Sequence, residues 1–198
     1  MDLVTNAGLL GCKPCSTHMN SRKSLQQDVG TPLNDVTQYR RLIRRLLYLC
    51  ITRSDITFVV HKLSQFLTKP CDGHMLAAER VLKYLKGTLG HSLHYASNFS
   101  LEVSMFSDAD WASCPDTRRS VSGFCLFIGS SLVSWRSKKQ HTISRSSTKA
   151  EYRVMVVACC EVVWITTLLA DFGVVLKCPT PLYCDNQAAI YHFKSSLP

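Results

Sequence analysis

Residues 101–108, Leu-Glu-Val-Ser-Met-Phe-Ser-Asp, decide the fold of this chain, because apolar and polar side chains alternate along them. A period of two is typical of a β-strand that buries one face. The runs at 123–129 and 132–135 are further strand candidates, and the Gly-Ser-Ser between them predicts a hairpin. The sheet is therefore expected to begin with three strands that follow one another along the chain.

A long apolar segment follows these strands and predicts a helix from about residue 146 to 172, which Gly173 ends. A short strand over 181–184 and a helix beginning at Asn186 come next. The order strand, strand, strand, helix, strand, helix is typical of an α+β or α/β domain with a mixed β-sheet. We expect this domain to cover residues 91–198.

The upstream part of the chain has the period of helices instead. Residues 1–35 hold several Gly and Pro residues and little periodicity, so we expect an extended segment there. Apolar side chains then recur every three or four residues over 39–50, 56–67 and 75–85, which predicts three amphipathic helices. We expect these helices to pack together as a separate unit over residues 36–90.

The composition is that of a globular protein with a basic surface. The 198 residues are 46% hydrophobic and 19% charged, which argues against wholesale disorder. Lys and Arg number 23 against 14 Asp and Glu, so the formal net charge is +9. This excess suits a polyanionic partner such as nucleic acid.

Ten cysteines would suggest a disulfide framework, but most stand in apolar runs, where a free thiol behaves as a small hydrophobe. The chain opens Met-Asp-Leu-Val without a secretory signal, so we expect a reduced, intracellular protein. Cys12 and Cys15 form one C-x-x-C motif near His18. Because no second pair completes a zinc site, we interpret them as loop thiols.

One segment, 154–170, could be mistaken for a membrane span. A span needs about 20 apolar residues, and a carboxylate at its centre is costly. Glu161 interrupts this segment. We therefore expect a buried helix and no membrane partner.

Three acidic residues stand where sheet domains gather functional side chains. Asp108 ends the first strand, Glu151 lies in the first turns of the long helix, and Asp185 ends the fourth strand. Converging carboxylates would repel one another unless a divalent cation lay between them, and hard oxygen ligands select Mg²⁺ or Mn²⁺. Alternatively, the two aspartates are turn residues and the glutamate favours the helix dipole. The spacing alone leaves both interpretations open.

Residues 117–150 include seven basic side chains and no acidic one, with Trp135 among them. The basic residues are Arg118, Arg119, Arg136, Lys138, Lys139, Arg145 and Lys149. Such a segment suits the phosphates of a nucleic acid. The alternative is a solvated charged surface, which is what runs of charge usually form.

Several motifs in the second half of the chain point to a family. They are Ser-Asp-Ala-Asp-Trp-Ala (107–112), Cys-Pro-Asp-Thr-Arg-Arg-Ser-Val-Ser-Gly (114–123), Ser-Trp-Arg-Ser-Lys-Lys-Gln (134–140), Ser-Arg-Ser-Ser-Thr-Lys-Ala-Glu-Tyr-Arg (144–153) and Tyr-Cys-Asp-Asn (183–186). Together they resemble the ribonuclease H region of copia-type retrotransposon Pol polyproteins.

Motifs in the first half resemble the same polyprotein between the reverse-transcriptase palm and ribonuclease H. They are Gly-Leu-Leu-Gly-Cys-Lys-Pro (8–14), Tyr-Arg-Arg-Leu-Ile (39–43), Leu-Tyr-Leu (47–49), Ile-Thr-Arg-Ser-Asp-Ile (51–56), Lys-Leu-Ser-Gln-Phe (62–66) and Arg-Val-Leu-Lys-Tyr-Leu-Lys-Gly-Thr (80–88). The resemblance thus covers nearly the whole chain. It implies a helical connection segment followed by a ribonuclease H-like domain.

The resemblance also implies an activity. Asp108, Glu151 and Asp185 match the family's metal-binding residues, which would hold two Mg²⁺ ions (or Mn²⁺) and cleave the RNA strand of an RNA–DNA hybrid. We expect hybrid contacts from Arg118, Arg119, Trp135, Arg136, Lys138, Lys139, Arg145 and Asn186. Further partners would be the rest of the polyprotein, with its reverse-transcriptase palm and integrase, in cytoplasmic virus-like particles, the nucleus or both.

The chain departs from the family pattern in two places. Lys149 replaces a usually acidic residue but should face away from Glu151, with little effect. The chain stops at Pro198, whereas the family continues with a His-rich loop and a strand and helix that carry the last catalytic acid. We expect a truncated, marginally stable domain of weak or no activity, and no polymerase activity. Asp110 is expected just past the strand end, in a structural role.

Two alternatives to a hybrid nuclease remain at this point. One is a non-catalytic nucleic-acid-binding remnant that keeps the basic segment. The other is an unstable product of a decayed element, without a role.

Overall fold

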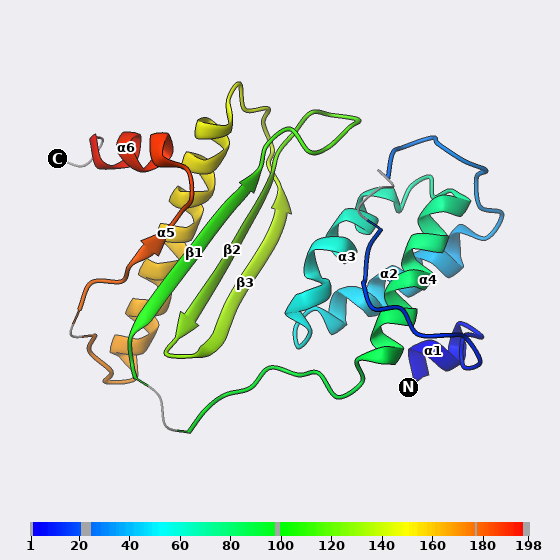
Figure 1. Ribbon diagram of the computed structural model, residues 1–198, viewed down its shortest axis with the longest axis horizontal. Coiled ribbons are helices and arrows are strands. Elements are labelled where there is room, and N and C mark those ends of the chain that lie inside the picture. The colour runs from blue at the N-terminus through cyan, green and yellow to red at the C-terminus, as the bar shows by residue number, and fades with distance from the viewer. Residues whose placement is uncertain (1, 21–24, 98–99, 177, 196–198) are drawn as a thin grey trace. The chain divides into compact units, whose positions relative to one another are not determined.

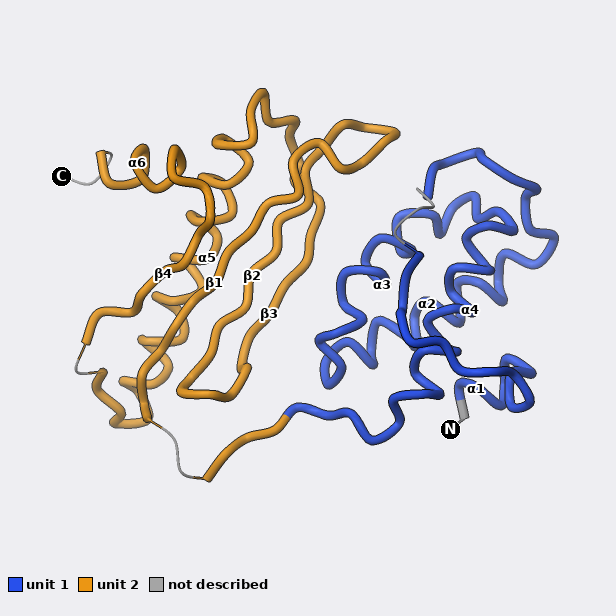
Figure 2. The backbone as a smooth tube through the Cα atoms, in the orientation of Figure 1, with its two compact units in different colours: residues 1–93 blue, residues 94–198 orange. Residues whose placement is uncertain are grey.

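The structure is a computed structural model that describes residues 2–20, 25–97, 100–176 and 178–195 (Figure 1). The chain divides into two compact units, residues 1–93 and 94–198 (Figure 2). All ten cysteines are free. Each unit has its own core and is considered separately.

The first unit is helical, as the apolar spacing predicts. Its elements are α1 (Asp2–Asn6), α2 (Val36–Leu49), the 3₁₀ turn η1 (Ser54–Ile56), α3 (Thr57–Leu63), the 3₁₀ turn η2 (Ser64–Phe66) and α4 (Asp72–Gly87). The predicted helix over 56–67 is thus a short α-helix between two 3₁₀ turns. Asp35 begins α2 by accepting a hydrogen bond from the amide of Gln38 at 3.0 Å.

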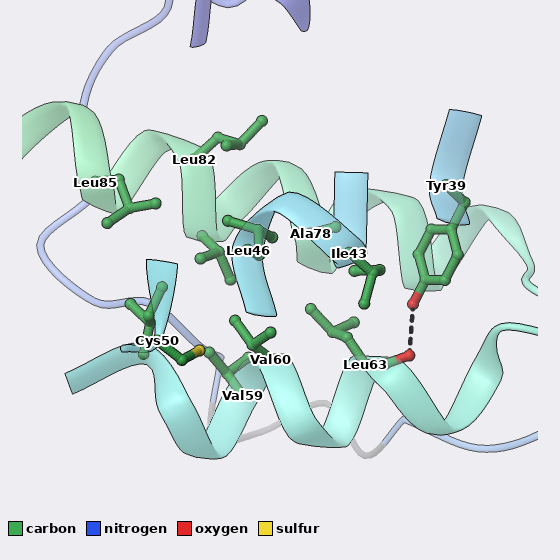
Figure 3. Packing of buried hydrophobic residues seen from close by; sticks show 12 residues of the cluster. Tyr39, Ile43, Leu46, Cys50, Val59, Val60, Leu63, Ala78, Leu82 and Leu85 are labelled. Carbon is green, nitrogen blue, oxygen red and sulfur yellow. Dashed lines mark hydrogen bonds between the residues drawn. The ribbon is translucent and has the colours of Figure 1, made fainter. Parts of the chain in front are cut away.

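The prediction of an extended segment over residues 1–35 is wrong at its start, where α1 forms. The reason is burial, because Val4 is 3% exposed and Leu3 and Ala7 pack against the core of the unit. That core is a cluster of fully or nearly fully buried residues from α2, η1, α3 and α4 (Figure 3). Tyr39 reaches across it and donates a 2.9 Å hydrogen bond from its hydroxyl to the carbonyl of Leu63.

The second unit is a mixed α/β structure, as the element order predicts. Its elements are β1 (Val103–Asp110), β2 (Val121–Ile128), β3 (Ser131–Lys139), α5 (Ser147–Asp171), β4 (Leu182–Tyr183) and α6 (Gln187–Ser195). The sheet order is β3-β2-β1-β4, in which β4 alone runs parallel to its neighbour β1. The mixed β-sheet is confirmed.

Helix α5 covers one face of this sheet (Figure 1). Met105 and Leu126 on the strands are fully buried in a cluster with Ala158 and Ile165 of the helix. On the opposite face, Phe106 and Tyr183 are 45% and 51% exposed, and their rings stack at 4.8 Å. The sheet therefore has one face covered by a helix and one with exposed aromatic rings.

The expectation of a buried helix over 154–170 holds for one side of α5 only. By length and composition this helix could cross a membrane, and 22% of its most apolar stretch is buried. Val163 and Trp164 are 64% and 58% exposed, because the sheet covers only one side of the helix. On the covered side, Ser134 of β3 donates a 2.7 Å hydrogen bond to the carboxylate of Glu161.

Candidate metal centre

Acidic side chains from two separate elements meet at one end of the sheet. Glu151 on α5 and Cys184 and Asp185, just after β4, each offer a ligand atom, and these atoms all lie within 4.8 Å of one another. Asp108, in β1, stands outside this group, but its charge acts on Glu151 and is acted on by Asp185. The structure thus brings the three predicted carboxylates within electrostatic reach and two of them within reach of one cation.

Glu151 is placed by the open edge of β1. Strand β4 pairs only with Met105 and Phe106, where the amide of Met105 donates to the carbonyl of Pro181 at 3.0 Å. The amide of Ala109, four residues further along β1, points to the same edge, because the backbone amides of a strand alternate between its two edges. It donates to Oε1 of Glu151 at 3.0 Å. The carboxylate therefore takes the place of a strand partner, since no strand in the described part of the chain pairs with this edge beyond Phe106, and Glu151 is only 4% exposed.

Helix caps fix the two segments that carry the acidic residues. Ser146 caps α5 by accepting a hydrogen bond from the amide of Lys149 at 3.3 Å. Asn186 accepts one from the amide of Ala189 at 2.9 Å and so holds the start of α6 directly after Asp185. Asn186, predicted to contact nucleic acid, thus has a local structural use for its side-chain oxygen.

Asp108 lies on the sheet face opposite α5, because it alternates with the buried Ser107 and Ala109. Asp110 is the last residue of β1, so two expectations are wrong: Asp108 does not end the strand, and Asp110 does not lie past its end. The strand is longer because Asp110 pairs with Val121 of β2. Two residues apart in one strand, Asp108 and Asp110 share a face.

Glu151 and Asp108 are harder to ionise than ordinary carboxyls. Burial raises the pKa of Glu151, the hydrogen bond from Ala109 lowers it, and the charges of Asp108 and Asp185 raise it further. Burial, then the charges of Asp185 and Asp110, raise the pKa of Asp108. None of the groups that shift these two pKa values is cationic. Negative charge is therefore concentrated here, which favours the binding of a divalent cation.

Cys184 is the member of this cluster that the sequence did not single out. Burial raises the pKa of its thiol, which stays protonated and donates to Oε2 of Glu151 at 3.8 Å. Its position next to Asp185 was the available signal. The donor set fits Mg²⁺ or Mn²⁺ through its carboxylate oxygens, whereas a protonated thiol is no ligand for these hard cations.

The predicted basic segment does not form one surface. The register pairs Arg136 with Phe124 and Lys138 with Ser122, on the face toward α5. Trp135 and Lys139 take the intervening positions, on the face of Asp108. Because successive side chains of a strand point to opposite faces, basic residues that are neighbours in the sequence lie on opposite faces of the sheet.

The remaining predicted basic residues lie in loops or at a helix start. Arg118 and Arg119 belong to the segment 111–120 between β1 and β2, Arg145 precedes α5, and Lys149 lies exposed in its first turn. Lys139 points toward the first of these loops, where its Nζ lies 3.7 Å from Sγ of Cys114. A cavity of about 370 Å³ between β3 and α5 is lined in part by Arg136, Lys138 and Arg153.

The described residues contain no second group of ligand atoms as close as Glu151, Cys184 and Asp185. Cys12 and Cys15 are partly exposed free thiols in the first unit, and His18 is not grouped with them. Burial lowers the pKa of His18, whose ring packs edge-on against Tyr84 at 5.4 Å.

The chain is similar to curated proteins over most of its length. It is 40% identical over 191 residues to the retrovirus-related Pol polyprotein from transposon RE2 of Arabidopsis thaliana, and 39% identical over 191 residues to that from transposon RE1. These matches cover 96% of the chain and 13% of each polyprotein. An uncharacterized mitochondrial protein of the same plant is 40% identical over 163 residues, which are 82% of the chain and 67% of that protein.

The chain thus spans about 13% of the length of the transposon polyproteins that it matches. No protein-family model matches it. No solved structure matches it either.

Proposed function

This chain belongs to the retrovirus-related Pol polyproteins of copia-like transposons, and we propose that residues 94–198 are a ribonuclease H-like domain that cleaves the RNA strand of RNA–DNA hybrids. Residues 1–93 are, in this proposal, the helical connection that precedes it in the polyprotein. The observation that carries the proposal is the meeting of Glu151 and Asp185, with Asp108 near by, at the open edge of the sheet.

The residues of this site have distinct tasks in such a reaction. Glu151, Asp185 and Asp108 would hold Mg²⁺, which when bound supplies an activated water and stabilises the leaving oxygen of the phosphodiester. The Ala109 amide keeps the Glu151 carboxylate oriented through Oε1. The thiol of Cys184 occupies the other side of that carboxylate, at Oε2.

Recognition of the hybrid is assigned to the basic residues around the sheet. The side chains of Trp135 and Lys139 lie on the sheet face of Asp108, and the loop that follows β1 carries Arg118 and Arg119. These residues are therefore best placed to contact phosphates near the cleaved bond. Discrimination of RNA would come from contacts to its 2′-hydroxyls. The other proposed partners are the remainder of the polyprotein, and the proposed setting is the cytoplasm or nucleus.

Cleavage of a labelled RNA–DNA hybrid by the full chain, with Mg²⁺, with Mn²⁺ and with EDTA, tests this proposal. In keeping with the weak activity expected from the sequence, we expect slow, metal-dependent cuts in the RNA strand and none in duplex DNA. Asp185→Asn should lower the rate by about a hundredfold or more, since it removes a charged ligand while keeping the shape. Asp171→Asn, at the far end of α5, is the matched control and should leave the rate unchanged.

Two outcomes would contradict the proposal. Cleavage that persists in EDTA or in Asp185→Asn would place the activity elsewhere, for instance in a contaminant. Salt-sensitive hybrid binding without any cleavage would favour the non-catalytic nucleic-acid-binding remnant instead.

A further inference from the structure

Gln140, the residue directly after β3, connects three segments around the start of α5. Its side-chain Nε2 donates to Oγ of Ser122 on β2 at 3.0 Å and to the carbonyl of Ala150 on α5 at 3.1 Å. Its Oε1 accepts from Oγ of Ser144 at 3.1 Å. Its backbone amide also donates to the carbonyl of Ser120 at 2.8 Å. Every polar group of this side chain thus has a partner in the protein.

The partners of Gln140 are themselves fixed. Ser144 is 3% exposed, and its Oγ accepts from Nη1 of Arg153 at 2.9 Å while its carbonyl accepts from Nε1 of Trp111 at 3.0 Å. Hydrogen bonds therefore run in one direction from Arg153 through Ser144 and Gln140 to Ala150. Such chains strengthen their members when all are satisfied.

On the side of the sheet, the start of α5 packs through smaller side chains than its middle does. The apolar cluster next to the site consists of Ala109, Ala150 and Val154, and two of these side chains are single methyl groups. Small side chains bury little apolar area, so they contribute little to fixing the helix. The larger cluster with Met105 and Leu126 lies further along the helix, at Ala158 and Ile165.

From this geometry we infer that Gln140 is a positioning residue for Glu151, acting through the carbonyl of Ala150. The bond at Ala150 fixes the residue directly before Glu151 against β2, and the carboxylate of Glu151 then meets the Ala109 amide of β1 at 3.0 Å. None of the hydrogen bonds of Gln140 described above involves a ligand atom of the site. The inference deepens the proposed nuclease and, as far as catalysis is concerned, rests on it.

Amide hydrogen exchange in the full chain tests the positioning without any need for activity. Gln140→Met keeps the length of the side chain and removes its polar atoms. We expect exchange at the Ala109 amide to become about tenfold faster relative to the Leu126 amide of the same sheet. Ser134→Ala is the matched control, since it removes another polar tie of α5 to the sheet, the 2.7 Å bond to Glu161. This control should leave the ratio of the Ala109 exchange rate to the Leu126 exchange rate, called the Ala109 ratio below, unchanged.

Mn²⁺ titration provides the second measurement. Gln140→Met should weaken Mn²⁺ binding by about tenfold, as loss of a ligand-orienting partner does, and should weaken it no further in a Glu151→Gln background. In cleavage assays it should lower kcat and leave the KM for hybrid unchanged. If Gln140→Met does not fold, Ser122→Ala removes one partner of Gln140 and should shift the Ala109 ratio in the same direction.

An unchanged Ala109 ratio in these variants would overturn the inference, whatever their activity. An equal shift in Ser134→Ala would also overturn it, because general loosening of α5 would then suffice. If the ratio shifts as expected but the wild-type chain neither binds Mn²⁺ nor cleaves hybrid, the positioning role stands and the nuclease proposal fails.

Discussion

The amide of Ala109 and the carboxylate of Glu151 are joined by a 3.0 Å hydrogen bond between β1 and α5, at the edge that β4 leaves open. This bond explains how a carboxylate can be 4% exposed beside other acidic groups. Glu151 thus has two properties that matter here: it accepts a hydrogen bond, and it carries a negative charge. Substitutions can test these one at a time.

Glu151→Gln should stabilise the second unit in metal-free buffer at pH 7. The pKa of Glu151 is raised in the folded state, so its contribution is fully favourable below the ordinary carboxyl pKa and is lost as pH rises through the folded-state pKa. Glutamine keeps an acceptor for Ala109 without the charge. We expect Tm to rise by roughly 2–6 °C, measured by differential scanning calorimetry.

The same experiment at different pH and metal concentrations provides the control. The gain should shrink at pH 4, where the wild-type carboxyl is closer to neutral, and Mn²⁺ should raise the Tm of the wild type more than that of the variant. Glu151→Ala, which removes the acceptor as well, should be less stable than Glu151→Gln. A lower Tm for Glu151→Gln at pH 7 would contradict this explanation.

Lys139→Glu and Lys138→Glu should differ in their effect on hybrid binding, although the residues are neighbours. Lys139 lies on the face of Asp108 and Lys138 on the face toward α5. We expect Lys139→Glu to weaken binding more and to reduce the slope of log K against log salt by about one. Fluorescence anisotropy at several salt concentrations measures both. Equal effects would mean that the hybrid contacts both faces.

Asp55→Asn should destabilise the first unit by about 1–3 kcal/mol. Arg53 is 8% exposed, and its Nε and Nη2 donate to the Asp55 carboxylate at 2.9 and 2.7 Å, while the hydroxyl of Tyr84 donates to it at 2.8 Å. The substitution leaves the guanidinium of Arg53 without its counter-ion. Urea unfolding followed by circular dichroism measures the loss, with the exposed Asp28→Asn as control.

The pH dependence of this unit follows from the same contacts. Burial would raise the pKa of Asp55, but the hydrogen bonds from Arg53 and Tyr84 outweigh it, so the pKa is lowered in the folded state. The stabilisation is therefore present above the ordinary aspartate pKa and is lost as pH falls through the folded-state pKa. Asp55→Asn should make the urea midpoint less sensitive to pH below 4. An unaltered acid sensitivity would assign it to other carboxyls.

Tyr39→Phe should cost the first unit about 1 kcal/mol, much less than Leu46→Ala at about 2–5 kcal/mol. Both side chains are fully buried in the same cluster, but phenylalanine keeps the ring and loses only the 2.9 Å bond to Leu63 (Figure 3). Alanine at position 46 leaves a cavity. Equal losses for both variants would show that the buried hydroxyl, rather than packing, dominates there.

Phe106→Thr should reduce self-association of the chain. Phe106 and Tyr183 expose a stacked pair of rings on the sheet face away from α5, and exposed apolar surface promotes association. Threonine keeps the β-propensity of the position. Analytical ultracentrifugation at increasing concentration should show less association than in the wild type. Val29→Thr, which removes an exposed apolar side chain of the first unit, is the control.

Most elements of the fold could be predicted from local patterns. The alternation over 101–108 identified β1, and the spacing over 39–50 identified α2, because each pattern records which side chains one face must bury. The helix α1 could not be predicted in this way. Its formation depends on burial of Val4 against residues far along the chain, which no short window contains.

The candidate site shows the same division. The sequence by itself determined the residue types, with Glu151 at a helix start and Asp185 just after a short strand, and it determined the similarity to transposon polyproteins. Only the tertiary structure decided that Cys184 lies close to Glu151 and Asp185, and that Lys138 and Lys139 lie on opposite faces of the sheet. The reason is physical: the position of a residue along the chain fixes its local conformation, whereas strand pairing and helix packing fix which distant side chains meet.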